Sequence, residues 1–436
     1  MSTLAAVRLW GRQIGAVLLD EGSETAVFEY EPAFVPSGIE LAPLTMPLRP
    51  GERYAFPGLA RETFRGLPGL LADSLPDRYG NALIDAWLAT QGRSPESFNM
   101  VERLCYIGTR GMGALEFEPS LGPTLPATRA LQVDALVELA SEILSQRTQL
   151  RASLADPQRA ATMQAILEVG TSAGGARAKA VIAWNPETNE VRSGQVNAGP
   201  GFQQWLLKFD GVSGNRDKEL EDPLGFGVVE YTYALMARGA GIVMSPCRLL
   251  EEGGRRHFMT RRFDRVEGDE KLHMQTLGAI AHFDYNQAGA HSYEQAFLVI
   301  RQLGLSMGAI EQEFRRMTFN VVARNQDDHV KNIAFLMERD GQWRLAPAYD
   351  LTHAYQPGGR WTSRHQMTIN GKRDGFTLAD LRAVAEVASM KRGRAETIVG
   401  EVTTAVERWG ELAEQVGLDR KRAAQIAATH RLVLLR

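Results

Sequence analysis

The chain has 436 residues, of which 44% are hydrophobic and 23% are charged. A chain of this length typically forms two or three domains, and the apolar fraction is ample for their cores. Its 49 Lys and Arg side chains nearly balance 52 Asp and Glu side chains, which leaves a formal net charge of −3. This balance argues against a long disordered tail and against a protein whose whole surface binds nucleic acid.

The expected location follows from the cysteines and the apolar runs. Cys105 and Cys247 are the only cysteines, so a disulfide framework or a thiolate metal site has little support and a reducing cytosol fits best. The first residues lack the basic segment and long apolar run of an export signal, and no later run reaches about 18 apolar residues. We therefore expect a cytoplasmic protein that does not contact a membrane.

The first part of the chain predicts a small mixed module. Short apolar runs alternate with Gly and Pro up to about residue 60, which is typical of β-hairpins. Over residues 61–93 the leucines recur at spacings of three and four, which predicts helix. Residues 119–126, Pro-Ser-Leu-Gly-Pro-Thr-Leu-Pro, suit neither a helix nor a central strand and predict a linker. We place the first domain at 1–122.

The remaining chain divides into two parts, at 123–260 and 261–436. In the first we expect a helix at 131–150 and buried strands at 180–184 and 204–209. In the second, helical spacing prevails. The helices predicted there span 294–303, 309–323, 378–389, 398–416 and 419–435. The expected fold class is α+β, with a mixed α/β N-terminal lobe and a mainly helical C-terminal lobe.

Three polar residues have the spacing of a phosphotransferase site. Asp327 and Asn332 stand five positions apart within Asn-Gln-Asp-Asp-His-Val-Lys-Asn (325–332), and Asp350 follows Ala-Pro-Ala-Tyr. Phosphoryl transfer from ATP uses a carboxylate beside the acceptor hydroxyl, an amide oxygen for one Mg2+, and a second carboxylate for the metal that bridges the phosphates. Asp327, Asn332 and Asp350 supply these groups in that order.

A glycine-rich segment and a lysine precede this site. Residues 170–179, Gly-Thr-Ser-Ala-Gly-Gly-Ala-Arg-Ala-Lys, allow main-chain N–H groups to approach phosphate oxygens closely. The segment lacks the P-loop pattern, and taken alone it favours a tight hairpin turn. Lys208 ends an apolar strand pattern, where its ammonium either reaches the ATP phosphates or faces water.

Histidines near the site are expected to have supporting roles. His329, two residues after Asp327, is expected to order the loop by hydrogen bonding. Lys331 either contacts the transferring phosphate or faces water. The nine-residue spacing of His273, His282 and His291 matches no zinc site, so no zinc is expected.

A glycine-rich loop followed by a strand lysine, Asp327, Asn332 and Asp350 resembles one known family over nearly the whole chain. This is the HipA-type serine/threonine kinases, which are toxins of bacterial type II toxin–antitoxin systems. Further segments that carry the resemblance are 75–77, 107–114, 172–179, 207–208, 262–265, 275–278, 347–350 and 369–372. The resemblance implies a two-lobed, protein-kinase-like fold.

The resemblance also implies roles for single residues. Asp327 would be the catalytic base, Lys208 would pair with the ATP phosphates, and Asn332 and Asp350 would hold Mg2+. Residues 262–264 would form the hinge whose main chain reaches the adenine, with Asp264 near the ribose. The implied nucleotide contacts are Ala173, Gly174, Gly175, Ala176, Arg177, Lys179, Lys208, Arg262, Phe263, Asp264, His329, Lys331, Asn332, Tyr349 and Asp350.

A self-limiting step follows from the same resemblance. Members of the family autophosphorylate a serine at the start of the phosphate loop, a place that Ser172 occupies here. A phosphate adds about −1.5 to −2 charges, so modification of Ser172 is expected to repel ATP and eject the loop. Arg177 and Ala178 stand where the family usually carries Gln-Glu.

The implied partners are macromolecules. An aminoacyl-tRNA synthetase is the expected substrate, and its phosphorylation would arrest translation and growth. A small helix-turn-helix antitoxin, HipB-like, is expected to bind the kinase and to bring it to DNA. Two alternatives stay open. One is a small-molecule or lipid kinase, because such enzymes share the spacing of Asp327, His329 and Asn332; the other is a catalytically silent corepressor of the antitoxin.

Overall fold

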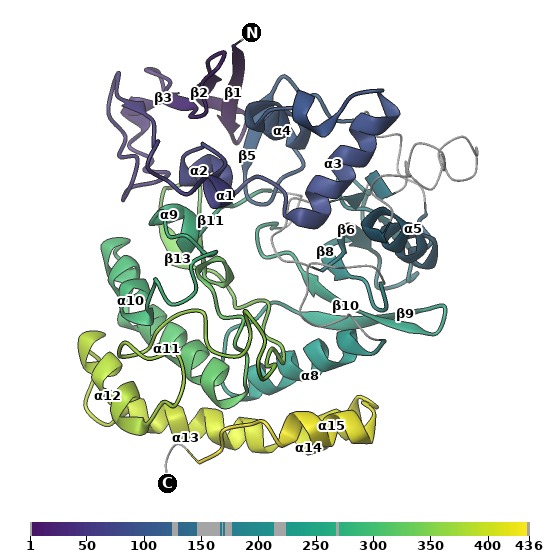
Figure 1. Cartoon of the computed structure of the whole chain (residues 1–436), viewed down its shortest axis with the longest axis vertical. Helices are drawn as coiled ribbons and strands as arrows, with labels where there is room; N and C mark the ends of the chain where they lie inside the picture. Colours follow the sequence, from purple (N-terminus) through teal and green to yellow (C-terminus); the bar gives the residue numbers. More distant parts are fainter. Residues whose placement is uncertain are drawn as a thin grey trace.

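A computed structural model of the protein describes residues 2–123, 130–145, 166–167, 169–170, 177–212, 224–266 and 270–433. Figure 1 shows the N-terminal module at the top, a second sheet at the right, and the helices of the C-terminal lobe along the left and bottom. This two-lobed arrangement confirms the predicted fold class. No helix in the described ranges is long and apolar enough to span a membrane.

The N-terminal module is built on an antiparallel sheet with the strand order β4-β3-β2-β1-β5. Its strands are β1 (Thr3–Leu9), β2 (Arg12–Leu19), β3 (Val27–Tyr30), β4 (Arg53–Tyr54) and β5 (Leu115–Glu118). Along β1, buried residues alternate with more exposed ones, as expected for a strand with one face on a core. That core includes Leu71 and Leu104, which come from two helices of the module.

The helical spacing over 61–93 corresponds to three short helices. They are α1 (Arg61–Phe64), α2 (Gly69–Ala72) and α3 (Arg78–Thr90). Helix α3 begins at Asp77, whose carboxylate accepts the Gly80 N–H at 2.8 Å. Helix α4 (Met100–Ile107) was not predicted, although Asn99 and Glu102 form a capping box at its start.

The second sheet is also antiparallel, with the strand order β7-β6-β8-β10-β9. Its strands are β6 (Lys179–Trp184), β7 (Val191–Ser193), β8 (Gln203–Lys208), β9 (Cys247–Glu252) and β10 (Arg255–Arg261). Strands β6 and β8 confirm the two predicted buried strands. Helix α5 (Val133–Ser145) and α3 share a core with this sheet, and helix α8 (Phe226–Gly239) packs along β10.

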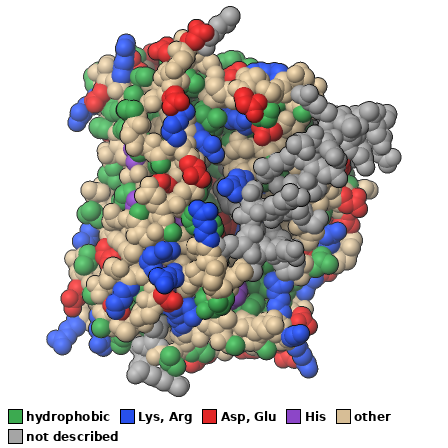
Figure 2. All heavy atoms as spheres, in the orientation of Figure 1, with side chains coloured by type: hydrophobic (Ala, Val, Ile, Leu, Met, Phe, Trp, Pro, Cys, Tyr) green, Lys and Arg blue, Asp and Glu red, His purple; other side chains and the backbone are tan. Residues whose placement is uncertain are grey.

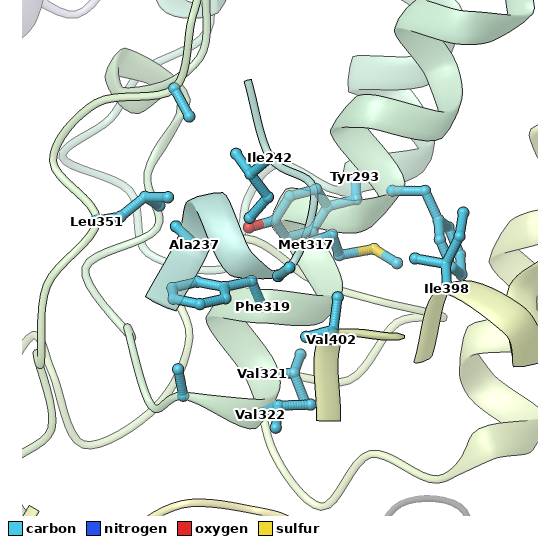
Figure 3. Close-up of a cluster of buried hydrophobic side chains, with 14 of the residues drawn as sticks. Ala237, Ile242, Tyr293, Met317, Phe319, Val321, Val322, Leu351, Ile398 and Val402 are labelled. Carbon is cyan, nitrogen blue, oxygen red and sulfur yellow. The ribbon is translucent and has the colours of Figure 1, made fainter. Parts of the chain in front are cut away.

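The C-terminal lobe has a helical core. Its helices are α9 (Leu277–Ile280), α10 (Tyr293–Gln302), α11 (Met307–Val322), α12 (Leu378–Val387), α13 (Arg394–Glu407), α14 (Trp409–Gln415) and α15 (Arg420–Ala427). Figure 3 shows Met317 of α11 extending towards Ile398 of α13, with Tyr293 of α10 beside Met317. The predicted helix at 398–416 is thus two helices, and the one predicted at 419–435 ends at Ala427.

A third antiparallel sheet, with the order β11-β12-β13, lies in the part expected to be helical. Its strands are β11 (His273–Thr276), β12 (Ala334–Met337) and β13 (Trp343–Leu345). The prediction missed them because runs of three or four residues are too short to show a period. Strand β12 is buried along its whole length and directly follows the 325–332 loop, so it anchors that loop. The domain boundaries at 122 and 260 stay a prediction.

Candidate active site

A central cleft lies between the second sheet and the C-terminal lobe. Its volume, counted to its open mouth, is about 1120 Å3. Its apolar lining includes Leu206, Met244, Phe258, Met274 and Leu351; its charged lining includes Asp73, Lys208, Glu230, Lys331 and Asp350. An apolar wall beside a cluster of charges suits a ligand with a base at one end and phosphates at the other.

Lys208 is held between two carboxylates at the end of β8. Its Nζ donates to Oε1 of Glu230 at 2.5 Å and to Oδ1 of Asp350. The side chains of Lys208 and Glu230 are 9% and 2% exposed. Burial lowers the pKa of Lys208, but Asp350 and Glu230 outweigh it and hold the pKa above its ordinary value. Lys208 is therefore a fixed positive charge in the cleft.

The carboxylate of Asp350 forms an ion pair with the Lys208 ammonium. Burial raises its pKa, but Lys208 and then Lys179 more than offset burial, and the net pKa lies below the ordinary value. Its backbone has a φ of 53°, in the left-handed region that non-glycine residues seldom adopt. Asp350 is thus ionised and held in a strained conformation, as befits a functional carboxylate.

Glu230 is a residue that the sequence analysis did not single out. It lies in the middle of α8, and its second oxygen accepts from Nη1 of Arg177 at 3.0 Å. The Arg177 guanidinium also lies over the Phe226 ring, 4.2 Å from its centroid. Glu230 therefore ties both Lys208 and the end of the glycine-rich segment to α8. The available signal was a lone carboxylate in the otherwise uncharged stretch Phe-Gly-Val-Val-Glu-Tyr-Thr-Tyr-Ala-Leu.

Lys179 makes its ion pair away from the cleft. Its Nζ lies 2.9 Å from Oδ2 of Asp77, the residue that caps α3. The Lys179 side chain is 1% exposed, and it is not part of the cleft lining. Lys179 thus fastens β6 to the N-terminal module, and its expected contact with a nucleotide stays a prediction.

The 325–332 loop brings the predicted acid and amide together. Asp327 is exposed, and its carboxylate has no hydrogen-bond partner among the described residues. Asn332 donates its Nδ2 to the Asp327 carbonyl oxygen at 2.7 Å, which leaves the Asn332 Oδ1 available to a metal. Asn332 lines the cleft, whereas Asp327 lies outside the lining.

Asp328 fixes the backbone on which Asp327 stands. Asp328 is 2% exposed, and its Oδ2 accepts from the Tyr293 hydroxyl at 2.9 Å and lies 2.7 Å from Nδ1 of His365. Its Oδ1 accepts the Gln366 N–H at 2.7 Å. Because one neighbour of Asp327 is so fully bonded, the position of Asp327 is well defined.

The remaining residues predicted in this lobe gather at the same end of the cleft. His329 and Lys331 line it, and Nζ of Lys331 lies 4.8 Å from the centroid of the Tyr285 ring. Tyr349 donates its hydroxyl to the Lys331 carbonyl at 2.6 Å. The Nδ1 of His329 is buried without a partner among the described residues. This nitrogen therefore does not make the loop-ordering hydrogen bond that we expected of His329.

The hinge residues differ from the expectation. Asp264 is 0% exposed, and its carboxylate accepts from Arg262, Arg265 and the Gly113 N–H at 2.7–2.9 Å. Burial raises its pKa, but the two arginines and these bonds hold the pKa well below its usual range. The Asp264 carboxylate is therefore not available to a ribose; it clamps the N-terminal module to the hinge.

The main chain of the hinge is also partly occupied. The Arg262 N–H donates to the Gln204 carbonyl at 2.9 Å, so it does not serve an adenine. Phe263 lines the cleft, and its ring centroid is 5.6 Å from that of Tyr349. Phe263 is the hinge residue best placed to contact a base. Ser172, Ala173, Gly174, Gly175 and Ala176 lie outside the described residues.

The oxygen ligands present suit Mg2+. Oδ1 of Asn332 and the carboxylate of Asp350 are hard donors in one cleft, and Mg2+ is commonly held by one or two carboxylates together with substrate phosphates. In the part of the chain that the structure describes, no group of three or more His, Cys, Asp or Glu side chains is suited to a metal. The residues thus fit a metal that arrives with a nucleotide.

Comparisons with known proteins agree with this geometry. The family described as HipA-like C-terminal domain matches residues 171–409, more than half of the chain, and the HipA N-terminal domain matches residues 5–118. The chain belongs to the HipA family. HipA of Shewanella oneidensis MR-1, solved in complex with HipB and operator DNA, has the same fold, with a TM-score of 0.66 at 18% identity, over 99% of this chain and 96% of that one.

Other relatives are more distant or match over shorter stretches. A putative kinase of Haemophilus influenzae is 33% identical over 102 residues, which cover 22% of this chain and 30% of that protein's length. The Helicobacter pylori proinflammatory kinase CtkA aligns with a TM-score of 0.29 at 9% identity, over 52% of this chain and 92% of that one. HipA-family membership thus rests on the two domain matches.

Proposed function

We propose that this HipA-family protein is an ATP-dependent serine/threonine-protein kinase. The observation that carries the proposal is the position of Lys208, bonded to both Glu230 and Asp350 inside the cleft. A lysine paired with a helix glutamate, facing a metal-binding aspartate, is the arrangement that protein kinases need for phosphoryl transfer. Asn332 and Asp327 follow on the adjoining loop.

Each residue has a defined task in the proposed reaction. Lys208 neutralises phosphate charge, and Asn332 and Asp350 would hold Mg2+, which would supply further positive charge against the phosphates. The acceptor oxygen bonds to the γ-phosphorus while the bond to the β–γ bridging oxygen breaks and ADP leaves. Asp327, which is exposed, orients the acceptor hydroxyl and receives its proton.

The proposal extends to partners and regulation. An aminoacyl-tRNA synthetase is the proposed substrate, with arrested translation as the consequence, and Ser172 is the proposed site of inhibitory autophosphorylation. A HipB-like helix-turn-helix antitoxin is the proposed partner, since the related Shewanella HipA was solved with HipB and operator DNA. Contact with DNA would then run mainly through the antitoxin.

A substrate panel tests the function. The purified protein is incubated with Mg-ATP and each of the purified aminoacyl-tRNA synthetases of its host, and phosphosites are mapped by mass spectrometry. We expect a phosphoserine or phosphothreonine on at least one synthetase, absent with Asp327→Asn. Transfer only to a metabolite or lipid would instead establish a small-molecule kinase, and no ATP turnover in any arm would favour a silent corepressor.

A further inference from the structure

The segment from Leu351 to Arg373 contains basic side chains but no acidic ones. Residues 351–373 contain Arg360, Arg364, Lys372 and Arg373, and no Asp or Glu. Lys372 pairs with Asp380, but no carboxylate in the described ranges pairs with Arg360 or Arg364, and both are exposed. The charges of these two arginines are therefore not neutralised by a carboxylate of the described residues.

This segment is bonded to the loop that carries Asp327. His365 and Gln366 both bond the carboxylate of Asp328, at 2.7 Å each. Arg364 directly precedes His365, and Asp327 directly precedes Asp328. The backbone position of Arg364 is therefore tied to the loop of the proposed base, which places Arg364 to contact a chain that brings a hydroxyl to Asp327.

The other side of the loop is fastened in the same way. The Gln326 N–H donates to the Ala354 carbonyl at 2.9 Å, and the Ala354 N–H donates to the Arg324 carbonyl at 3.1 Å. The guanidinium of Arg360 lies 4.8 Å from the ring centroid of Trp361, which restrains a long side chain that would otherwise be free. The segment is thus pre-organised rather than loose, which lowers the cost of binding.

The guanidinium groups of Arg364 and Arg373 lie close enough to repel one another. Burial lowers the pKa of Arg373, and Arg364 lowers it further, while Asp328 acts in the opposite direction. An anion placed at Arg364 would relieve this repulsion. The nearest acid in sequence, Asp374, is already paired with Arg324 and Arg431, so Asp374 does not supply that anion.

We propose that Arg360 and Arg364 form an acceptor-docking site for protein segments that carry Asp or Glu beside the phosphorylated serine or threonine. The inference rests on the proposed kinase function. Guanidinium groups bind carboxylates in a bidentate manner. Asp327 and Asp350 would otherwise repel an acidic acceptor, and the two arginines offset that repulsion.

A protein acceptor fits better than a nucleic acid. The whole chain has a net charge of −3, and Arg360 and Arg364 belong to one short segment rather than to a stripe across the surface. On the face of the molecule that Figure 2 shows, Lys and Arg side chains are interspersed with Asp and Glu side chains. A mixed surface of this kind does not favour a long phosphate backbone.

Peptide binding tests the inference without requiring turnover. Three fluorescent 13-residue probes have a central serine flanked by four Glu, four Lys or four Ala, and their anisotropy is followed with the full chain and Mg-ADP. We expect the Glu peptide to bind at least about tenfold more tightly than the Lys peptide. In Arg360→Glu/Arg364→Glu that order should reverse, and in Arg392→Glu, an exposed arginine elsewhere, it should persist.

Several results would overturn the inference. Equal binding of the three peptides, or a Glu preference that survives the double charge reversal in a variant with wild-type melting temperature, would remove the docking site. A 13-nucleotide single-stranded RNA that binds more tightly than the Glu peptide, and loses affinity in the same variant, would assign the arginines to nucleic acid instead. Glu-peptide binding without any phosphoryl transfer would keep the docking site and remove only the kinase function.

Discussion

Glu230 offers a sharp test of how the cleft works. The change Glu230→Gln keeps the size of the side chain and one oxygen acceptor, but it removes the charge and sets an NH2 group against Lys208 or Arg177. In the nucleotide-free protein Lys208 still has Asp350 as a partner. Once Asp350 binds a metal, Glu230 is the one remaining carboxylate bonded to Lys208 among the described residues, so we expect the loss to appear mainly in catalysis.

The size of the effect follows from the bond that is lost. A hydrogen bond between charged groups contributes about 1.5–3 kcal/mol, and each 1.4 kcal/mol corresponds to a factor of ten. The 2.5 Å contact between nearly buried groups belongs in that range. We therefore expect kcat/KM for ATP to fall about 10- to 150-fold in Glu230→Gln.

The assay is steady-state ADP release at saturating acceptor, with Glu313→Gln as the matched control. Glu313 is 1% exposed, like Glu230, and it pairs with Arg316 at 3.4 Å, but it does not line the cleft. Both variants lose a buried carboxylate, so both should lose stability in urea unfolding. A kcat/KM in Glu230→Gln within threefold of the wild type, or an equal loss in Glu313→Gln, would refute the reasoning.

Two further predictions concern the loop support and the pH response. Asp328→Asn should lower the free energy of unfolding by about 1.5–3 kcal/mol, because its NH2 group would face the Tyr293 hydroxyl or His365; urea unfolding at wild-type stability would contradict this. Burial lowers the pKa of His257 to about 4, against the weaker opposing effect of Asp210. Stability is then lost as pH falls from about 6.5 towards 4, by up to about 1.4 kcal/mol per pH unit. His257→Asn, which keeps an acceptor for the Asp210 N–H, should flatten this acid slope, and an unchanged slope would show that His257 does not titrate on unfolding.

The sequence predicted the parts of the site that depend on local spacing. Asp327, Asn332 and Asp350 lie within 24 residues of one another, and Asp327 and Asn332 share a short loop between a helix and a buried strand, which leaves these two few ways to diverge. Lys208 was predicted from a strand pattern, and β8 confirms the strand. Their roles in catalysis stay proposals.

The parts that sequence reasoning missed depend on contacts between distant segments. Glu230 reaches Lys208 only because α8 packs along the second sheet, which no spacing shows. Asp264 was placed near a ribose, but Gly113, 151 positions earlier, and two arginines occupy it. The strands of the third sheet were missed for a different reason, since segments of three or four residues are too short to reveal a period.

One measurement tests the central claim most directly. Protein freed of prior phosphate by phosphatase is incubated with Mg-ATP, and its intact mass and phosphosites are followed beside Asp327→Asn and beside Asp340→Asn, an exposed aspartate in the loop between β12 and β13. The account predicts a gain of one phosphate, on Ser172, in the wild type and in Asp340→Asn, and none in Asp327→Asn. An equal gain in Asp327→Asn would contradict the assignment of Asp327 as the catalytic base, and no gain in any of the three would contradict autophosphorylation.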